Sequence, residues 1–231
     1  MRKLLLLATF FCLCIPIAAQ QEDPTQKLRQ FQMAILKQGP NPMPPEGEKS
    51  PLRQEHLAYV HSLFETGKAI IAGRIQDDPE LRGVFVFNTK SADEAKEWIS
   101  GDPLVKAGHL TVELHPWWSE PVMKKLTAAP QKMETAYLAF LVRGEKWTAE
   151  KTPATEAIQK AHLANIGKLA ETKKLVVAGP FGDDGALRGV FVFRVSSIDE
   201  ARSLANTDPA VQAGRLALQI HPWIVPEGIL P

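Results

Sequence analysis

Short apolar runs alternate with longer amphipathic stretches along the chain. The run from Phe31 to Lys37 is apolar and lies between turn-forming residues, which is typical of a strand. From Leu52 onward, apolar positions recur every three or four residues, and Ser50-Pro51 before them has the composition of a helix start. Gly67 is expected to end this helix, because glycine readily takes the left-handed conformation that closes helices.

Two further strands, a second helix and a last strand are predicted to follow. Residues 69–75 and 83–88 are rich in β-branched and aromatic residues, as strands are. Ser91-Ala-Asp-Glu94 has the form of a capping box and opens a helix, which Asp102-Pro103 ends because the residue before proline avoids the helical conformation. Residues 110–114 alternate apolar and polar, as in a half-buried strand. The order β-α-β-β-α-β is that of the ferredoxin-like arrangement.

The same pattern occurs twice, at an offset of 106 residues. Residues 56–117 align without a gap with residues 162–223, and 31 of the 62 aligned pairs are identical. The same offset places Tyr137 to Val142 on Phe31 to Leu36, so the first strand is also repeated. We therefore divide the chain into repeat 1 (residues 28–118), a proline-containing linker (119–134) and repeat 2 (135–226).

The predicted central strand constrains how the two repeats assemble. Val84-Phe85-Val86-Phe87 places apolar side chains on both faces of the strand, and the same four residues recur in repeat 2. If helices covered only one face of the sheet, apolar and polar residues would alternate along this strand. The second face therefore needs an apolar cover, and the sheet of the other repeat is the nearest one. We expect an α+β fold in which two ferredoxin-like repeats pack sheet to sheet within one chain.

Residues 1–19 have the order of a secretory signal peptide. Basic Arg2 and Lys3 precede an apolar stretch, and the small residues Ala18 and Ala19 follow it. The apolar stretch is shorter than the ~20 residues of a membrane-spanning helix, and no later segment reaches that length. We expect cleavage near Ala19 and export to the periplasm or the cell exterior.

Both cysteines of the chain, Cys12 and Cys14, lie within this expected leader, so the exported protein would contain no disulfide. Acylation of Cys14, as in a lipoprotein, is a less favoured alternative because Phe11-Cys12-Leu13 lacks the small residues expected before such a cysteine.

Charge and motifs exclude several classes of function. The 27 Lys and Arg residues nearly balance the 26 Asp and Glu residues, which gives no electrostatic reason to expect nucleic acid or an anionic membrane as partner. A neutral small molecule or another protein fits this balance equally well. The sequence has no glycine-rich phosphate loop, no Gly-x-Ser-x-Gly elbow and no Cys-x-x-Cys pair, so no cofactor is expected.

Taken together, these elements resemble the YCII-related (YciI-like) domain family. The resemblance rests on a helix with a central His, the sequence Ala-Gly-Pro-Phe-Gly-Asp-Asp-Gly at 178–185, a Gly-Val-Phe-Val-Phe strand, a helix running into Asp-Pro, and a closing Pro-Trp. Repeat 2 fits better, since repeat 1 has Arg74 where the family pattern favours proline. The resemblance implies the dimeric α/β barrel fold and a pocket with a His-Asp pair proposed as catalytic. The matching positions are His56 with Asp102, and His162 with Asp208.

Each of these candidates also has a structural explanation. His56 and His162 lie on the apolar stripe of their helices, where a core histidine bonded to a backbone carbonyl would serve equally. Asp102 and Asp208 precede proline after a helix, which is ordinary turn chemistry.

Arg82 and Arg188 begin the central strand of each repeat. A guanidinium there can hold an anionic group of a substrate through a bidentate contact, or it can pair with a loop acid such as Asp77 or Asp183.

His115 and His221 precede Pro-Trp at the end of the last strand, where strand termination explains them. A metal site is not expected, because no further ligands can be assigned beside them.

Two function classes stay open from the sequence. The first is an enzyme that acts on a small organic molecule by proton transfer, with a His general base oriented by an Asp. The second is a non-catalytic binding or structural barrel module. Bonded His-Asp pairs at a pocket favour the first, and a pocket filled by Phe and Trp side chains favours the second.

Overall fold

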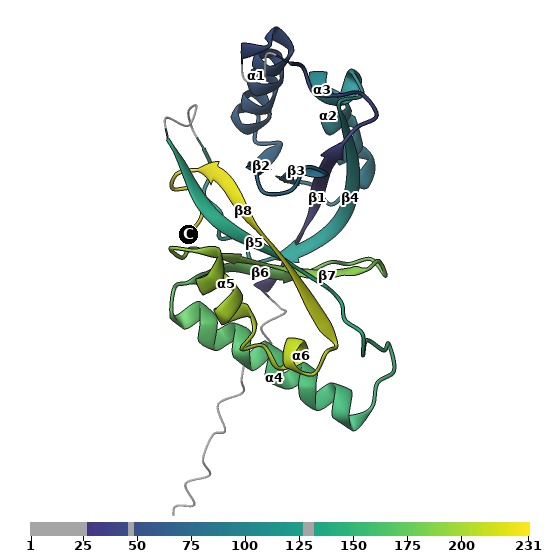
Figure 1. Ribbon diagram of the computed structural model, residues 1–231, viewed down its shortest axis with the longest axis vertical. Coiled ribbons are helices and arrows are strands. Elements are labelled where there is room, and N and C mark those ends of the chain that lie inside the picture. The colour runs from purple at the N-terminus through teal and green to yellow at the C-terminus, as the bar shows by residue number, and fades with distance from the viewer. Residues whose placement is uncertain (1–26, 46–48, 127–131) are drawn as a thin grey trace, which may run out of the picture.

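The computed structural model describes residues 27–45, 49–126 and 132–231 (Figure 1). The expected leader, with Cys12 and Cys14, and the middle of the expected linker lie outside these ranges. Within them, no helix has the length and apolar character needed to cross a bilayer.

Each repeat has the predicted order of strands and helices, with one short helix added before the last strand. Repeat 1 comprises β1 (Arg29–Gln38), α1 (Pro51–Glu65), β2 (Ala69–Ile75), β3 (Leu81–Phe87), α2 (Ala92–Ser100), α3 (Pro103–Lys106) and β4 (Leu110–Ser119). Repeat 2 comprises β5 (Met133–Arg143), α4 (Pro153–Glu171), β6 (Leu175–Pro180), β7 (Leu187–Phe193), α5 (Ile198–Ala205), α6 (Pro209–Gln212) and β8 (Leu216–Pro226). Sequence reasoning missed α3 and α6, which begin at the prolines that were taken only as helix stops.

The predicted helix starts are correct, but each capping box makes only one of its two hydrogen bonds. Ser91 Oγ accepts the N–H of Glu94 at 3.2 Å, and Ser197 Oγ accepts that of Glu200 at 3.1 Å. Neither glutamate returns the bond to its N-cap residue. The Glu200 carboxylate instead accepts hydrogen bonds from Lys174 and Ser196, and these contacts lower the pKa of Glu200 to about 2.

The eight strands form one curled antiparallel sheet in the order β4-β1-β3-β2-β8-β5-β7-β6. Each repeat contributes four adjacent strands, and β2 of repeat 1 pairs with β8 of repeat 2 at Arg74↔Ile224 and Ile75↔Trp223. At the other ends of the order, a single bridge joins Trp117 of β4 to Phe181, just after β6. The expectation of two separate sheets therefore needs correction, because the two halves are joined edge to edge.

The central strands divide their side chains between two environments, as their unbroken apolar sequence requires. Val190 and Val192 of β7 belong to the core cluster that contains the strands of repeat 1. Phe191 and Phe193, on the opposite face, pack in a second cluster with Ala201 and other residues of the helices of repeat 2. Figure 1 shows α1 and α4 on opposite outer sides of the curled sheet. The inner face of each half is thus covered by the other half.

The first strands correspond at an offset of 105 residues, and not 106. Ala34 pairs with Phe85 in repeat 1, whereas Ala139 pairs with Phe191 in repeat 2. The expected match of Phe31–Leu36 with Tyr137–Val142 is therefore wrong by one residue. Because side chains alternate along a strand, this slip would exchange the inner and outer faces. Repeat 2 has one residue more between its first strand and the aligned part of its helix, and α4 begins about one turn earlier than α1.

Glycines allow the two repeats to approach closely. A Cβ atom on Gly179 of β6 would lie 1.7 Å from the carbonyl oxygen of Trp118. The carbonyl of Gly179 itself accepts a hydrogen bond from Trp117 Nε1 at 3.1 Å. In repeat 1, a Cβ atom on Gly73 would lie 2.4 Å from Trp223 Nε1. Both junctions between the repeats therefore exclude a side chain at this position.

Replacing Gly179 by Ala should lower the free energy of unfolding by roughly 3 kcal/mol or more, because backbone would have to move to admit the methyl group. Gly167 in α4 is the matched control, since a Cβ atom there meets nothing within 4 Å. Gly167→Ala should raise stability by up to about 1 kcal/mol through helix propensity. Urea unfolding of both variants measures the difference. A Gly179→Ala protein as stable as the wild type would contradict this contact between the repeats.

Candidate active site

The His-Asp pair of repeat 1 is formed and buried. His56 projects from α1, and its Nδ1 lies 2.7 Å from Asp102 Oδ2. The second carboxylate oxygen, Oδ1, accepts the N–H of Leu104 at 2.8 Å and so caps α3. Asp102 is completely buried and the His56 side chain is 11% exposed. One carboxylate thus holds both the helix and the imidazole.

Repeat 2 contains the equivalent pair. His162 Nδ1 lies 2.6 Å from Asp208 Oδ2, and Asp208 Oδ1 accepts the N–H of Ala210 at 2.8 Å. The ring of His162 is stacked on Phe191, with 6.1 Å between ring centroids. The four predicted residues therefore form two separate pairs, one beside α1 and one beside α4.

The carboxylate determines the tautomer of each imidazole. An ionised carboxylate can only accept hydrogen bonds, so Nδ1 of the histidine must donate. In the neutral ring the lone pair is then on Nε2. Each pair therefore presents Nε2 as a base, with a carboxylate behind the ring that stabilises the imidazolium formed when the base takes a proton.

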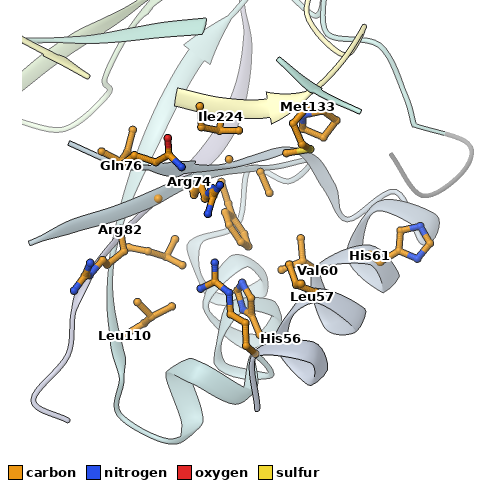
Figure 2. Close-up of a pocket in the computed structure, with 18 of the residues that line it drawn as sticks. His56, Leu57, Val60, His61, Arg74, Gln76, Arg82, Leu110, Met133 and Ile224 are labelled. Atoms are coloured by element: carbon orange, nitrogen blue, oxygen red, sulfur yellow. The ribbon is translucent and has the colours of Figure 1, made fainter. Parts of the chain in front are cut away.

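A cavity of about 1120 Å³ lies between α1 and the outer face of the sheet in repeat 1. His56 on α1 and Arg74 on β2 line it from opposite sides (Figure 2). The wall also includes Met133 of β5 and Ile224 and Pro226 of β8. The second repeat thus completes the site of the first. Apolar side chains form most of the remaining lining: Leu36, Met43, Leu57, Val60, Phe64, Ala72, Ile75, Phe85 and Leu110.

The two predicted substrate-binding arginines have different surroundings. Arg82 borders the cavity, and its Nε donates to the side chain of Gln38 at 3.0 Å. Arg188 lies over the ring of Trp147, 4.7 Å from its centroid, and donates to the backbone carbonyl of Asp183 at 3.1 Å. Neither arginine makes the predicted ion pair with the carboxylate of Asp77 or Asp183. Of the two, only Arg82 borders this cavity.

Two lining residues were missed as site candidates, Arg53 on α1 and Arg74 on β2. Arg53 precedes His56 by three residues, which places both on one face of the helix. Arg74 carried a visible signal, because it replaces the proline found at the equivalent position, Pro180. A difference between two otherwise similar repeats was therefore informative here.

The histidines near the ends of β4 and β8 join the two repeats reciprocally. His115 Nδ1 lies 2.7 Å from Asp183 Oδ2, and His221 Nδ1 lies 3.1 Å from Asp77 Oδ1. His115 and His221 are 106 residues apart, and so are Asp77 and Asp183. Each repeat therefore supplies one His and one Asp to the two contacts. Interpreting these four residues only as strand ends and turns missed this contact, which becomes apparent only when the two repeats are brought together.

No group of three or more His, Cys, Asp or Glu side chains is arranged to hold a metal ion within the described parts of the chain.

The comparisons with known proteins agree with this architecture. The fold and site define a tandem α+β protein with a His-Asp pair in each half. The model of the YCII-related domain family matches residues 9–118 and 137–224, which is most of the chain. The chain therefore belongs to the YCII-related domain family.

One sequence relative is the uncharacterized protein YjpA of Bacillus subtilis (strain 168). It is 31% identical over 87 residues, which is 38% of this chain and 92% of the relative. The relative thus corresponds in length to about one repeat.

Solved structures share the fold at low sequence identity. A chlorite dismutase from Candidatus Nitrospira defluvii has a TM-score of 0.53 and 14% identity, with 85% of this chain and 90% of that chain covered. A haem-binding protein from Thermus thermophilus has a TM-score of 0.53 and 13% identity, with 85% of this chain and 92% of that chain covered. At these identities the likeness establishes the fold alone.

Replacing both Asp77 and Asp183 by Asn should destabilise the protein by about 1 kcal/mol per site, because each change removes a charge-assisted bond that is partly open to solvent. The two losses should add, since the pairs share no residue. Urea unfolding of the two single variants and the double variant tests this.

The control is Asp184→Asn, which removes a neighbouring exposed charge and should change stability by less than about 0.5 kcal/mol. If the double variant behaved like this control, the reciprocal pairs would contribute nothing to holding the repeats together.

Proposed function

We propose that the chain is a small-molecule-binding enzyme in which His56 exchanges a proton with a molecule bound in the cavity of repeat 1. The observation that carries the proposal is the position of the ring. Its Nδ1 is held by a buried carboxylate while the residue lines a cavity large enough for a small organic molecule.

The proton step follows from the donor and acceptor roles of the ring. His56 Nε2 takes a proton from the bound molecule, and the imidazolium that results is stabilised by Asp102 behind it. The same Nε2 returns the proton to the molecule, so the imidazole is regenerated.

We propose further that the two repeats form a closed, intramolecular dimeric α/β barrel. Support comes from the β2–β8 pairing, the Trp117↔Phe181 bridge at the other junction, and the common core inside the curled sheet. The sequence relative of about one repeat in length is consistent with a barrel built from two such units. Export is also a proposal, and it rests on the order of residues 1–19 alone.

The role of His56 can be tested without knowing the substrate. Diethyl pyrocarbonate acylates unprotonated imidazole nitrogen, and mass spectrometry of peptides gives the rate at each histidine. His56 should react in the folded protein. In Asp102→Asn it should react at least about tenfold more slowly, because the carboxylate holds Nδ1 as the donor and leaves Nε2 as the nucleophile, and a hydrogen bond to a charged group contributes roughly 1.5–3 kcal/mol.

Repeat 2 provides the matched control in the same molecule. His162 should keep its rate in Asp102→Asn and lose it in Asp208→Asn. An unreactive His56 in the folded wild type, or an equal rate with and without the Asp102 carboxylate, would reduce His56 to a core residue and favour a binding module without chemistry.

A fragment of residues 135–231 tests the intramolecular barrel. Its inner sheet face would lose the cover that repeat 1 supplies, so it should form a homodimer or aggregate. Size-exclusion chromatography with light scattering measures this, and the full chain should elute as a monomer at the same concentration. A stable, soluble, monomeric fragment would rule out the barrel.

A further inference from the structure

Three arginines of repeat 2 surround the ring of one tryptophan. Arg143 is the last residue of β5, Arg188 is the second residue of β7, and Arg215 directly precedes β8. Their guanidinium carbons lie 5.5, 4.7 and 5.3 Å from the centroid of the Trp147 ring, as in cation–π contacts. The ring is partly buried and packs against the core of repeat 2. Because the three strands are antiparallel neighbours, one aromatic side chain gathers three positive charges at a single edge of the sheet.

A backbone carbonyl fixes the position of each guanidinium group. Arg143 donates to the carbonyl of Asp184 at 2.6 Å, and Arg188 donates to that of Asp183 at 3.1 Å. Arg215 donates to the carbonyl of Thr148 at 2.9 Å. A guanidinium carries several N–H donors in one plane, so most donors of each group have no protein partner in the described ranges. A carbonyl has no net charge, and the positive charges of the cluster therefore persist.

No carboxylate neutralises these charges by direct contact. The carboxylate of Asp183 is engaged with the other repeat, since its Oδ2 lies 2.7 Å from His115 Nδ1. Its Oδ1 accepts the N–H of Gly185 at 3.3 Å. Glu145 and Asp184 are exposed, and neither forms an ion pair with another part of the chain that the structure describes. The cluster can thus attract an anion from solution.

The cluster is specific to repeat 2. Gln38 is the counterpart of Arg143, because each pairs with the first residue of the last strand of its repeat. His109 is the counterpart of Arg215 at the offset of 106 residues. The third arginine is present in both repeats, but in repeat 1 Arg82 donates to the side chain of Gln38. Repeat 1 therefore has one arginine where repeat 2 has three.

From these observations we propose that Arg143, Arg188 and Arg215 bind a multiply charged oxyanion, the phosphate or diphosphate group of a small molecule. The planar N–H donors of arginine match the oxygens of a phosphate group. Three neighbouring cations favour such a group over a single carboxylate, because the Coulomb attraction grows with the charge of the ligand.

The extent of the cluster favours a small ligand over a nucleic acid. The Lys and Arg residues of the whole chain are balanced by its Asp and Glu residues. The three arginines lie at one edge of three neighbouring strands, whereas a nucleic acid is bound along a longer basic surface. This site is separate from the cavity of repeat 1, so the inference goes beyond the proposed proton transfer.

Isothermal titration calorimetry of the full chain with inorganic pyrophosphate tests the site. The titration is carried out at a mildly alkaline pH, where histidine is neutral and pyrophosphate carries several negative charges. One pyrophosphate should bind per chain, at least about tenfold more tightly than acetate at the same ionic strength, because it makes more charge-assisted hydrogen bonds. Added salt should weaken the binding, since it screens the charges.

Arg143→Gln and Arg215→His replace two of the arginines by their counterparts of repeat 1. Each should weaken pyrophosphate binding about tenfold, and the double variant should bind more weakly than either. The control is Lys96→Gln, which removes one positive charge at an exposed position on α2 of the other repeat and should leave the affinity unchanged. Circular dichroism and urea unfolding confirm that each variant is folded. Arg143 is exposed, so its replacement should not disturb the fold.

Acetate binding as tight as pyrophosphate binding, or pyrophosphate binding that neither arginine variant weakens, would overturn the site. A single-stranded DNA oligonucleotide that binds more tightly than pyrophosphate, with a salt dependence that indicates more phosphate contacts than three arginines can make, would overturn the small ligand. The rate of His56 acylation is measured without any ligand, so a failure here and a failure of the proposed proton transfer are distinguishable.

Discussion

The structure depends on one constraint, the need to bury both faces of the central strands. In β3 and β7 the valines belong to the core shared by both repeats, and the phenylalanines lie toward the helices of their own repeat, so both faces of each strand are covered. The pairing of β2 with β8 follows from this requirement. So do the glycines at both junctions, because strands that share a core must approach to backbone distance there. The reciprocal His115–Asp183 and His221–Asp77 pairs then close the polar edges of the same junctions.

Because the inner face is filled by side chains from both repeats, the site lies on the outer face, between α1 and the sheet. The carboxylate that orients His56 is placed there by helix capping, since one oxygen of Asp102 binds the first turn of α3. The structural role of this aspartate, capping α3, belongs to Oδ1, and its contact with His56 belongs to Oδ2. Any substitution that removes the carboxylate acts on both contacts, and Asp208 has the same two roles in repeat 2.

Much of the fold could be predicted from the sequence because its signals are local or repeated. Periodicity, capping residues and Asp-Pro located the strands and helices, and the resemblance to the YCII-related domain family located the His-Asp pairs. The misses have physical causes. The short α3 needs only four residues and left no periodic signal. The predicted alignment of the first strands was wrong by one residue, because the extra residue of repeat 2 lies in a connection whose composition differs between the repeats. Only the pairing of these strands with β3 and β7 reveals the correct alignment.

The His-Asp hydrogen bonds between the repeats and the composition of the cavity wall were beyond sequence reasoning for another reason. His115 and Asp183 are 68 residues apart, and no local pattern links them. The cavity combines residues of α1, β2 and β3 with Met133 of β5 and Ile224 of β8, so its composition appears only after both repeats are folded together. Arg74 was noticed as an unusual residue, but its place in the cavity wall required knowledge of what faces it.

Covalent linkage of the two repeats has a consequence for how such a site can change. In a symmetric dimer of identical chains, every substitution occurs in both subunits at once, so a residue that improves one site must also be tolerated in its twin. Here position 53 is arginine while its counterpart is Gln159, and position 74 is arginine while its counterpart is Pro180. Linkage thus removes the requirement that both halves carry the same residue. Each half can therefore keep the shared scaffold while the residues around its own His-Asp pair differ from those of the other half.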